Sequence, residues 1–299
     1  GSGRTVGPAI VDHGDYVMFT GSTATGRVIA RRAGERLIGV SAELGGKNAM
    51  IVTDDVDLDA AVEGAVVACF ANTGQLCISI ERIYVHRSIA DLFIERLGRR
   101  AQSLRLGAEQ AFGPEVGALA SAAQLEKVRA HVDDAVAKGA RLVAGGRHRP
   151  DIGPLFYEPT VLTEVTPEMD LYREETFGPV VAVYPVDGDD EAIEQANDTE
   201  YGLNASVWCG DVARGRAIAE RLLAGTVNVN DGYASAWGSM KASGLGRRHG
   251  REGLLKYTES RTVAVRSKLA ARLQDPTGDQ EGYARRFSAL LRKAKHLPR

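Results

Sequence analysis

The sequence contains little cysteine. Its 299 residues include only three, Cys69, Cys77 and Cys209, at scattered positions. Three scattered cysteines cannot form the disulfide framework of a small secreted domain, and the absence of a C-x-x-C pair argues against a zinc site. We therefore expect no metal centre and a reducing, cytoplasmic location.

Strong net charge and long apolar runs are also missing. The formal net charge is −2, which indicates neither a nucleic-acid partner nor an acidic solvating tail. The apolar runs are short and interrupted by glycine or charged residues, so we expect no membrane-spanning segment. The first residues, Gly1-Ser2-Gly3-Arg4, lack the apolar core of a secretory signal.

What the sequence does contain is the pattern of an α/β protein. With 44% hydrophobic and 25% charged residues, the chain is globular in composition and long enough for one large domain or two ordinary ones. Short β-branched runs alternate with helical stretches, which predicts a mostly parallel sheet. We expect strands at residues 16–20, 40–44, 49–52, 83–85, 180–186, 205–208, 226–230 and 262–266. We expect helices at residues 23–33, 58–71, 88–103, 122–138, 190–196 and 212–223, with Asp57 and Ser88 as N-caps and Gly139 as a C-terminal stop.

A glycine-containing turn, Gly21-Ser22-Thr23-Ala24-Thr25-Gly26, joins the first strand to the first helix. Free backbone N–H groups at the start of a helix favour a phosphate. The turn is neither a Walker loop nor a G-x-G-x-x-G fingerprint, and about half of such turns are only tight connections. Because this strand and turn come within the first 21 residues, with no earlier unit to pair with, we expect the start of a parallel sheet to be missing.

An acidic residue stands at the end of the second strand. Glu43 is followed by Leu44-Gly45-Gly46-Lys47, and the two glycines let the backbone approach a ligand or another chain segment closely. Parallel α/β folds place their sites at such strand ends. A solvent-facing glutamate before a turn explains the same pattern.

One cysteine differs in context from the other two. Cys77 follows Gly74-Gln75-Leu76 in a loop between a helix and a strand, where backbone N–H groups can lower the pKa of a thiol. The alternative is a small buried hydrophobe, which is the usual fate of a free cysteine. Cys69, on an apolar helix, and Cys209, at a strand end, suit that alternative.

Seven short motifs recur in a fixed order along the chain. They are Phe19-Thr20-Gly21-Ser22-Thr23-x-x-Gly26, Glu43-Leu44-Gly45-Gly46-Lys47-Asn48, Gly74-Gln75-x-Cys77, Glu175-x-Phe177-Gly178-Pro179, Tyr201-Gly202-Leu203, Asn228-x-Asn230 and Lys241-x-Ser243-Gly244-x-Gly246-Arg247. In order and spacing these motifs resemble the aldehyde dehydrogenase superfamily. The interval between Glu43 and Cys77 is also the usual one in that family, and the resemblance covers about residues 10–267.

The resemblance implies an aldehyde dehydrogenase-like α/β fold. Residues 1–45 would be the C-terminal remnant of a Rossmann-type cofactor-binding domain, and residues 46–250 the α/β catalytic domain. Residues 251–267 would be an oligomerisation strand region, and residues 268–299 a basic tail. The resemblance also implies a homodimer or homotetramer.

The resemblance further implies a mechanism. Cys77 would attack an aldehyde to form a thiohemiacetal, its own backbone N–H would help to hold the oxyanion, and hydride transfer to NAD or NADP would leave a thioester. Glu43 would deprotonate the water that releases the carboxylic acid. Asn230 would support the floor of the site rather than react.

Several residues match cofactor contacts of the family. Glu175 matches the residue that binds the nicotinamide ribose, and Phe177 matches the one that packs beside the nicotinamide ring. Gly21 and Ser22 would lie at the pyrophosphate. Leu44, Gln124 and Lys127 also fall at cofactor-contacting positions.

The chain departs from the family pattern in several places. The family's oxyanion asparagine, its cofactor-binding lysine and the residue that selects NAD or NADP would all lie upstream of Gly1. Residues 231–240 form a shorter substrate loop than is usual. In overall sequence the chain is most similar to bacterial succinate-semialdehyde dehydrogenases that use NADP. However, Ala71 stands where the better-known ones have a carboxylate-binding arginine, and Ile78 and Ser79 stand where they carry a second cysteine.

Three alternatives to such an enzyme stay open at this point: an aldehyde dehydrogenase of broad specificity, a thiol hydrolase that uses Cys77 and Glu43 without hydride transfer, and a fragment that cannot hold a cofactor.

The tail contains a possible amphipathic helix. Its apolar face would carry Tyr283, Phe287, Leu290 and Leu291, and its opposite face Arg285, Arg286, Arg292 and Lys293. Such a helix usually packs against a partner subunit or against another part of its own chain. Less commonly, it binds to a membrane surface.

Overall fold

The computed structural model describes residues 1–109, 112–232, 238–265 and 279–294. Its contacts divide the chain into two compact units, residues 1–257 and residues 258–299. The first unit contains a seven-stranded sheet and a three-stranded sheet. The α/β class predicted from the sequence is therefore confirmed.

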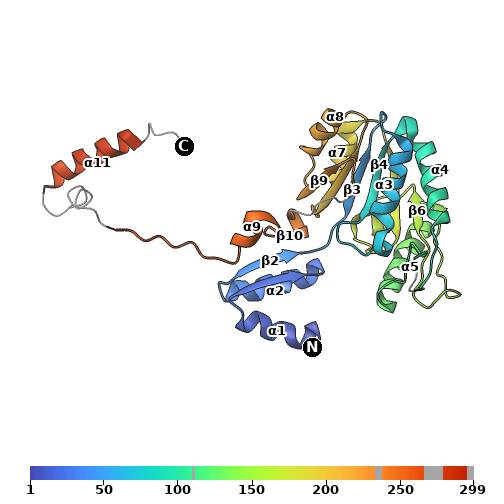
Figure 1. Ribbon diagram of the computed structural model, residues 1–299, viewed down its shortest axis with the longest axis horizontal. Coiled ribbons are helices and arrows are strands. Elements are labelled where there is room, and N and C mark those ends of the chain that lie inside the picture. The colour runs from blue at the N-terminus through green and yellow to red at the C-terminus, as the bar shows by residue number, and fades with distance from the viewer. Residues whose placement is uncertain (110–111, 233–237, 266–278, 295–299) are drawn as a thin grey trace. The chain divides into compact units, whose positions relative to one another are not determined.

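The large sheet is parallel except at one edge (Figure 1). Its strand order is β5-β6-β7-β4-β3-β8-β9, and only β5 runs antiparallel to its neighbour. The strands are β3 (Asn48–Val52), β4 (Ile80–His86), β5 (Arg141–Ala144), β6 (Thr160–Thr163), β7 (Val180–Val186), β8 (Asn204–Trp208) and β9 (Thr226–Val229). The sequence pattern predicted all of these except β5 and β6.

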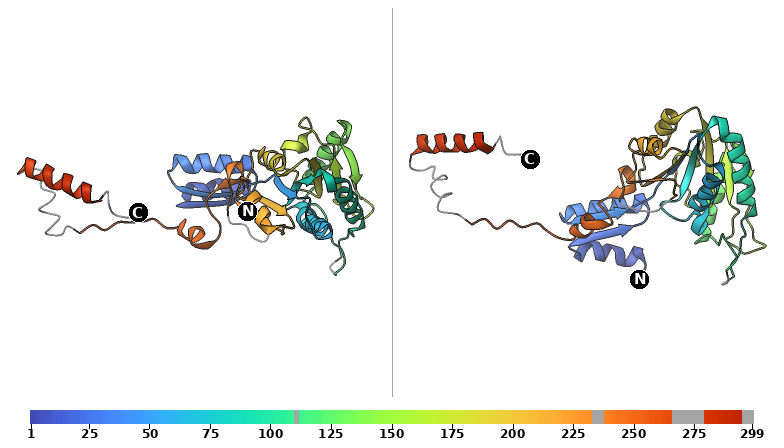
Figure 2. Two further views of the ribbon diagram at one scale, coloured as in Figure 1. Left: turned by 90° about the horizontal axis from the view of Figure 1, so that it is seen from above. Right: turned by 45° about the horizontal axis from the view of Figure 1, so that its top comes forward.

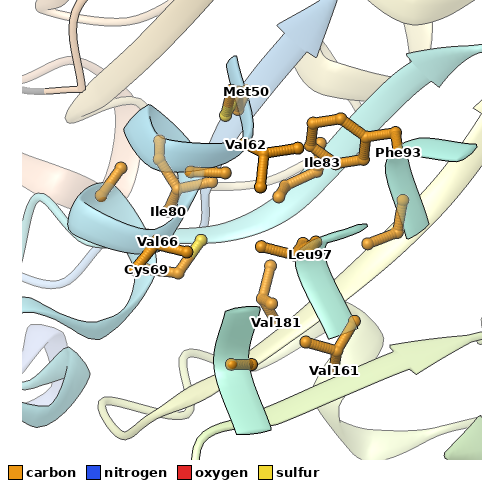
Figure 3. Close-up of a cluster of buried hydrophobic side chains, with 14 of the residues drawn as sticks. Met50, Val62, Val66, Cys69, Ile80, Ile83, Phe93, Leu97, Val161 and Val181 are labelled. Atoms are coloured by element: carbon orange, nitrogen blue, oxygen red, sulfur yellow. The ribbon is translucent and has the colours of Figure 1, made fainter. Parts of the chain in front are cut away.

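Helices cover both faces of the large sheet, which explains why its central strands are apolar throughout rather than alternating. One face packs against α3 (Leu58–Phe70) and α4 (Arg87–Ser103), and the other packs against α5 (Ala122–Ala137), α7 (Asp189–Asn197) and α8 (Val212–Ala219). Figure 2 shows these layers from two further directions. In the first core, Val62, Val66 and Cys69 of α3 lie against Ile80 and Ile83 of β4 (Figure 3). Cys69 is thus the buried hydrophobe that its context predicts, and Cys209 is also buried.

The helix ends agree only partly with the expected caps. The Asp57 side chain accepts hydrogen bonds from the backbone N–H groups of Asp59 and Ala60, as predicted for an N-cap. The predicted Ser88 cap is wrong, because α4 begins one residue earlier and the His86 side chain accepts the bond from the Ser88 N–H. Gly139 follows α5 with a left-handed φ of +106°, as expected of a helix stop.

The small sheet contains β1 (Tyr16–Thr20) and β2 (Gly39–Glu43) in parallel, with β10 (Gly244–Leu245) antiparallel to β2. Helices α1 (Gly3–His13) and α2 (Thr23–Glu35) accompany it. A small core of Val11, Val17 and Ala33 joins α1, β1 and α2. The sequence pattern did not predict α1 or β10, and only the fold brings β10 back to β2 from the far end of the unit.

Short elements complete the described chain. They are the 3₁₀ turns η1 (Ala71–Gly74) and η2 (Lys241–Ser243) and the helices α6 (Asp170–Arg173), α9 (Gly250–Leu255) and α11 (Gln280–Ala294). The strand predicted at 262–266 is wrong for residues 262–265, which form no strand and where Val263 and Val265 are largely exposed. Arg266 lies outside the described residues.

The second unit contains α11, which confirms the helix predicted in the tail. Tyr283 and Phe287 stack on each other with ring centroids 5.8 Å apart, while Leu290 and Leu291 are 51% and 52% exposed. Among the described helices, α11 included, none combines the length and the apolar character needed to cross a lipid bilayer.

Candidate active site

Glu43 ends β2 and is buried, so the solvent-facing alternative is wrong. It pairs with Thr20 of β1 and Gly244 of β10 across the small sheet, and only 8% of the residue is exposed. Its Oε1 atom is buried and makes no hydrogen bond to any described residue. A buried carboxylate oxygen without a partner is costly and needs an explanation beyond packing.

The charge of Glu43 is controlled by its surroundings. Burial raises the pKa of its carboxyl, and the positive charges of Arg248, Lys256, His249 and Arg247 oppose that rise. Arg248 is held in place by a 3.0 Å hydrogen bond from Nη1 to Oγ1 of Thr20, the strand partner of Glu43. The Glu43 carboxyl therefore has a pKa above its ordinary value, set by burial against four nearby positive groups.

Cys77 follows a backbone segment that only tight packing can hold. Asn72, Thr73 and Gly74 have φ values of +51°, +62° and +68°, all in the left-handed region. For two of these, which are not glycine, this conformation stores strain of about 1–3 kcal/mol each. A Cβ atom on Gly74 would lie 2.1 Å from the carbonyl oxygen of Gly178. The loop that carries Cys77 is thereby packed against the segment that leads into β7.

Cys77 is half-buried, and its environment raises the pKa of its thiol. Burial is the largest cause, and the carboxylates of Glu175 and Glu43 add to it, while the residue's own backbone N–H and Arg248 act in the opposite direction. The backbone N–H of Cys77 does act to lower this pKa, as expected, but burial and the two acidic neighbours outweigh it, so the net shift is upward. The same interactions show that Cys77 lies within electrostatic reach of both glutamates.

Two asparagines that the sequence did not single out hold the cysteine segment in place. Asn48 donates from Nδ2 to the carbonyl oxygens of Cys77 (2.8 Å) and Ser79 (2.7 Å), and its Oδ1 accepts from the Asn204 N–H at 3.0 Å. Asn204 in turn donates to the carbonyl oxygen of Ile78 at 3.0 Å. The available signal was an asparagine at the first position of a buried strand, which holds for both β3 and β8.

Glu175 lies directly over the glycine pair. The Gly46 N–H donates to its Oε1 at 2.9 Å, and a Cβ on Gly45 would lie 2.5 Å from its Oε2. Gly45 is therefore required for the close approach of Glu175. Burial, and next the charge of Glu81, raise the pKa of Glu175 to about 7, against the opposing effects of the Gly46 N–H, Lys127 and Lys47.

Phe177 lies two residues after Glu175, in a segment that helix α5 contacts. Phe177 has a left-handed φ of +56°. Gln124 of α5 donates to the carbonyl oxygens of Thr176 (2.8 Å) and Phe177 (2.9 Å), so its amide supports this segment. Lys127, on the same helix, acts on the site through its charge, which lowers the pKa of Glu175.

The glycine turn is a well-formed helix start. The Ser22 side chain caps α2 by accepting from the Thr25 N–H, and the Gly21 N–H donates to the Glu43 carbonyl oxygen at 3.1 Å. Leu44 is buried, and a Cβ on Gly26 would lie 2.5 Å from its Cδ2. Leu44 therefore packs against α2.

Asn230 is placed away from these residues. Its Oδ1 accepts a 2.9 Å hydrogen bond from the backbone N–H of Cys209, after β8. This bond ties two segments together, which is a supporting role rather than a reactive one.

The fold explains why these residues meet. Glu43 lies at the carboxyl end of β2, whereas Cys77 and Glu175 precede the amino ends of β4 and β7. The chain leaves the small sheet at Glu43 and enters the large sheet at Asn48. The candidate site therefore lies where the two sheets of the first unit adjoin along the chain.

The sequence also matches known proteins. A profile of the aldehyde dehydrogenase family matches residues 1–263. The chain belongs to this family. The resemblance that the seven motifs indicate is thus confirmed.

The similar proteins include named succinate-semialdehyde dehydrogenases. One from Mycobacterium ulcerans, "Putative succinate-semialdehyde dehydrogenase NADP(+) 2", is 61% identical over 272 residues, which are 89% of this chain and 52% of that protein. One from Mycolicibacterium smegmatis, with a similar name, is 57% identical over an alignment of 306 positions that covers all of this chain and 59% of that protein. The chain thus spans between half and three-fifths of the length of these relatives.

Solved structures of the family have the same fold. Betaine aldehyde dehydrogenase from Staphylococcus aureus, in complex with NAD+, matches with a TM-score of 0.83 and 38% identity over 86% of this chain and 53% of that one. An aldehyde dehydrogenase from Bacillus cereus matches with a TM-score of 0.83 and 40% identity over 87% of this chain and 54% of that one. At this identity the agreement supports the family as well as the fold.

The residues present fit the nicotinamide end of the cofactor that the family uses. Glu43 carries a buried oxygen without a described partner, and Glu175 presents a half-buried carboxyl beside Gly45, where no side chain fits. A carboxyl group that is a hydrogen-bond acceptor when charged and a donor when neutral suits a ribose hydroxyl.

Proposed function

We propose that this chain carries the catalytic part of an NAD(P)+-dependent aldehyde dehydrogenase. The observation that carries the proposal is the buried Glu43 carboxyl, whose Oε1 has no hydrogen-bond partner among the described residues, within electrostatic reach of the half-buried Cys77 thiol, in a chain of the aldehyde dehydrogenase family. A nucleophile and a base with separate environments are what a two-step reaction through a covalent intermediate needs.

In the first step, the Cys77 thiol gives its proton to solvent water and its sulfur adds to the aldehyde carbon, so that the carbonyl π electrons move to oxygen and form the oxyanion of a thiohemiacetal. The backbone N–H of Cys77 stabilises the oxyanion, and the Asn48 bonds keep the peptide carbonyl of Cys77 oriented. The chemistry that bound NAD(P)+ supplies is acceptance of a hydride, and a thioester on Cys77 follows from it.

In the second step, Glu43 takes a proton from a water molecule whose oxygen adds to the thioester carbon. The carbon–sulfur bond then breaks, the acid leaves and the sulfur regains a proton. Burial raises the pKa of Glu43, and a carboxylate with a raised pKa accepts a proton from water more readily than an ordinary one.

Seven residues would bind or position the cofactor. Glu175 would hold the nicotinamide ribose and Phe177 would pack beside the ring, with Gln124 supporting Phe177 through its carbonyl oxygen. Lys127 would adjust the charge of Glu175. Gly21 and Ser22 would lie at the pyrophosphate, and Leu44 would contact the cofactor next to the base.

The substrate we propose is succinate semialdehyde, because the relatives that match most of this chain carry that name. Ala71 does not provide the carboxylate contact found in better-known members. A dehydrogenase of broad aldehyde specificity is the second candidate, and that missing contact is the observation that favours it.

We also propose the division of the chain into a cofactor-domain remnant at 1–45, a catalytic domain at 46–250, an oligomerisation region at 251–267 and a tail at 268–299. A homodimer or homotetramer in the cytoplasm is the expected form.

One assay tests the function. NAD(P)H absorbance is followed with succinate semialdehyde and with simple aldehydes, for the 299-residue chain and for a chimaera that supplies the part of the Mycolicibacterium smegmatis relative that this chain does not match. We expect NADPH formation by the chimaera. Formation only by the chimaera would identify the 299-residue chain as an incomplete enzyme, and no formation by either protein, with Cys77 still labelled by iodoacetamide, would refute the proposal.

Two variants assign the roles. Cys77→Ala should abolish turnover, while Glu43→Gln should slow acid release by about 10²–10⁴-fold and let the acyl-enzyme accumulate. Hydrolysis of p-nitrophenyl acetate needs no cofactor. In the 299-residue chain it measures attack by Cys77 on the ester and hydrolysis of the resulting acyl-enzyme. Normal deacylation by Glu43→Gln would remove its role, and ester hydrolysis without NAD(P)H formation in the chimaera would favour a thiol hydrolase.

A further inference from the structure

The ion pair of Lys47 and Glu81 is the most buried one among the described residues. Lys47 Nζ lies 2.6 Å from Glu81 Oε2, and the two side chains are 1% and 4% exposed. Moving two charges out of water costs several kcal/mol per ion, and apolar replacements of a buried pair are often as stable. Stability alone therefore does not account for this pair.

A β-bulge aims Glu81 away from the regular strand direction. Asn48 of β3 pairs with Ile80 of β4, but the next residue, Ala49, pairs with Arg82. Glu81 is skipped in the register, and such an extra residue re-aims a side chain, often beside an active site. Arg82 donates to the Lys47 carbonyl oxygen from Nε (2.9 Å) and Nη2 (2.6 Å), so Glu81 and Arg82 hold Lys47 at both its side chain and its backbone.

The Glu81 carboxylate also binds the segment on its other side. The Thr176 N–H donates to both of its oxygens, at 3.1 and 2.9 Å, and the Phe177 N–H donates to Oε1 at 2.9 Å. Hydrogen bonds from backbone N–H groups to a buried carboxylate are stronger than neutral ones. They stabilise the left-handed backbone of Phe177, which a residue with a side chain adopts only when its surroundings demand it.

Residues 175–177 are also held by Gly46, which precedes Lys47, and by His131 of α5. The Gly46 N–H donates to Glu175, while Nδ1 of His131 lies 3.1 Å from Oγ1 of Thr176. Residues 175–177 are therefore held through Glu81, His131 and the glycine pair, and Lys47 joins two of these three supports.

We infer that the Lys47–Glu81 pair is a positioning device that holds Glu175 and Phe177 in the geometry that receives the nicotinamide half of the cofactor. The inference rests on the proposed function for the identity of the ligand. The positioning itself concerns only residues of this chain. Neither Lys47 nor Glu81 has to touch substrate or cofactor for this role.

The test compares Glu81→Gln with Glu164→Gln. The control has the same chemical change in an exposed ion pair, that of Arg141 and Glu164. Hydrogen–deuterium exchange of the 299-residue chain should show amides of residues 174–178 exchanging at least tenfold faster in Glu81→Gln, with no change in the control. In the chimaera, the dissociation constant of NADP+ or NAD+ should rise at least tenfold, while hydrolysis of p-nitrophenyl acetate by the chain stays within twofold of wild type.

Unchanged exchange in residues 174–178, or exchange that accelerates equally throughout the chain, would overturn the inference. A parallel loss of ester hydrolysis would do so as well, because it would show that the damage reaches Cys77. Should Glu81→Gln fail to fold, Lys47→Met combined with Glu81→Gln leaves no uncompensated buried charge and takes its place. If the wild-type chimaera reduces neither cofactor, the proposed function fails while the exchange result still decides the positioning.

Discussion

At the scale of single residues, the site consists of groups whose pKa values lie above their ordinary ones. Burial raises the pKa of Glu43, Cys77 and Glu175 alike. The cations that oppose this come from chain segments distant in sequence, such as Arg248 near Glu43 and Lys127 near Glu175. Ionisation of the site therefore depends on the tertiary structure more than on the residues themselves.

Replacement of Arg248 tests this control of charge. Arg248→Gln removes the first of the positive charges that lower the pKa of Glu43, so that pKa should rise. The rising limb of deacylation against pH should then move upward by roughly 0.5–1 pH unit, measured with p-nitrophenyl acetate. The matched control is Arg251→Gln, the same change on the neighbouring helix α9. An unshifted profile in Arg248→Gln would show that Arg248 does not act on the base.

Glu175 should make the stability of the protein depend on pH. Its pKa is raised from 4.5 to about 7 in the folded chain, so the folded state binds its proton more tightly than the unfolded state does. The resulting stabilisation is fully present below pH 4.5 and is lost as pH rises through about 7. Wild type should therefore lose stability between pH 4.5 and 8, while Glu175→Gln should not. Over this range the free energy of unfolding of the variant should rise relative to that of wild type by on the order of 1–3 kcal/mol.

Urea unfolding at several pH values measures this difference. Glu95→Gln, in an exposed ion pair of α4, serves as the control and should follow wild type at each pH. A constant difference between Glu175→Gln and wild type would contradict the assignment.

At the scale of elements, the site residues lie in loops or at the end of a strand. Cys77 follows η1, Glu175 precedes β7, and Glu43 stands at the last position of β2. The elements supply rigid ends, while close backbone contacts such as that between Gly74 and Gly178 fix the loops to one another. This division agrees with the general location of functional residues on loops held by a scaffold.

The Gly74 contact provides a test at this scale. Gly74→Ala places a Cβ 2.1 Å from the Gly178 carbonyl oxygen and requires an alanine at φ +68°, so it should lower the free energy of unfolding by about 2–4 kcal/mol. It should also change the rate at which iodoacetamide labels Cys77. Gly139→Ala is the control, because Gly139 also has a positive φ but no atom within 4 Å of the added Cβ.

The control should cost about 1 kcal/mol and leave Cys77 labelling unchanged. Equal costs for the two variants would mean that backbone strain, rather than the contact between the two loops, sets the requirement for Gly74.

At the scale of the whole chain, contacts divide the molecule into residues 1–257 and 258–299. The first unit joins a small sheet, closed by β10 from late in the chain, to a large sheet with helices on both faces. The family match ends at residue 263, close to the boundary of this unit. The amphipathic helix α11 therefore belongs to a part of the chain outside the family profile.

Deletion of residues 279–299 tests the independence of the first unit. Because the contacts of residues 1–257 group separately from those of the tail, the melting temperature of that unit should fall by less than about 2 °C. Calorimetry of the full and shortened chains measures this. A larger loss would show that the tail stabilises the first unit, and a change of oligomeric state on the same deletion would assign α11 to an interface between copies.

The sequence by itself determined the α/β class, most strands of the large sheet, and the family, because these follow from local periodicity and from motifs in a fixed order. It also singled out Cys77, Glu43, Glu175 and Phe177. Only the tertiary structure decided that Glu43 is buried without a described partner, that the Cys77 thiol has a raised pKa, and that Asn48 and Glu81 hold the loops. The reason is that burial and hydrogen bonding depend on neighbours far along the chain, as Glu81 and Thr176 are, and no local pattern records which segments will meet.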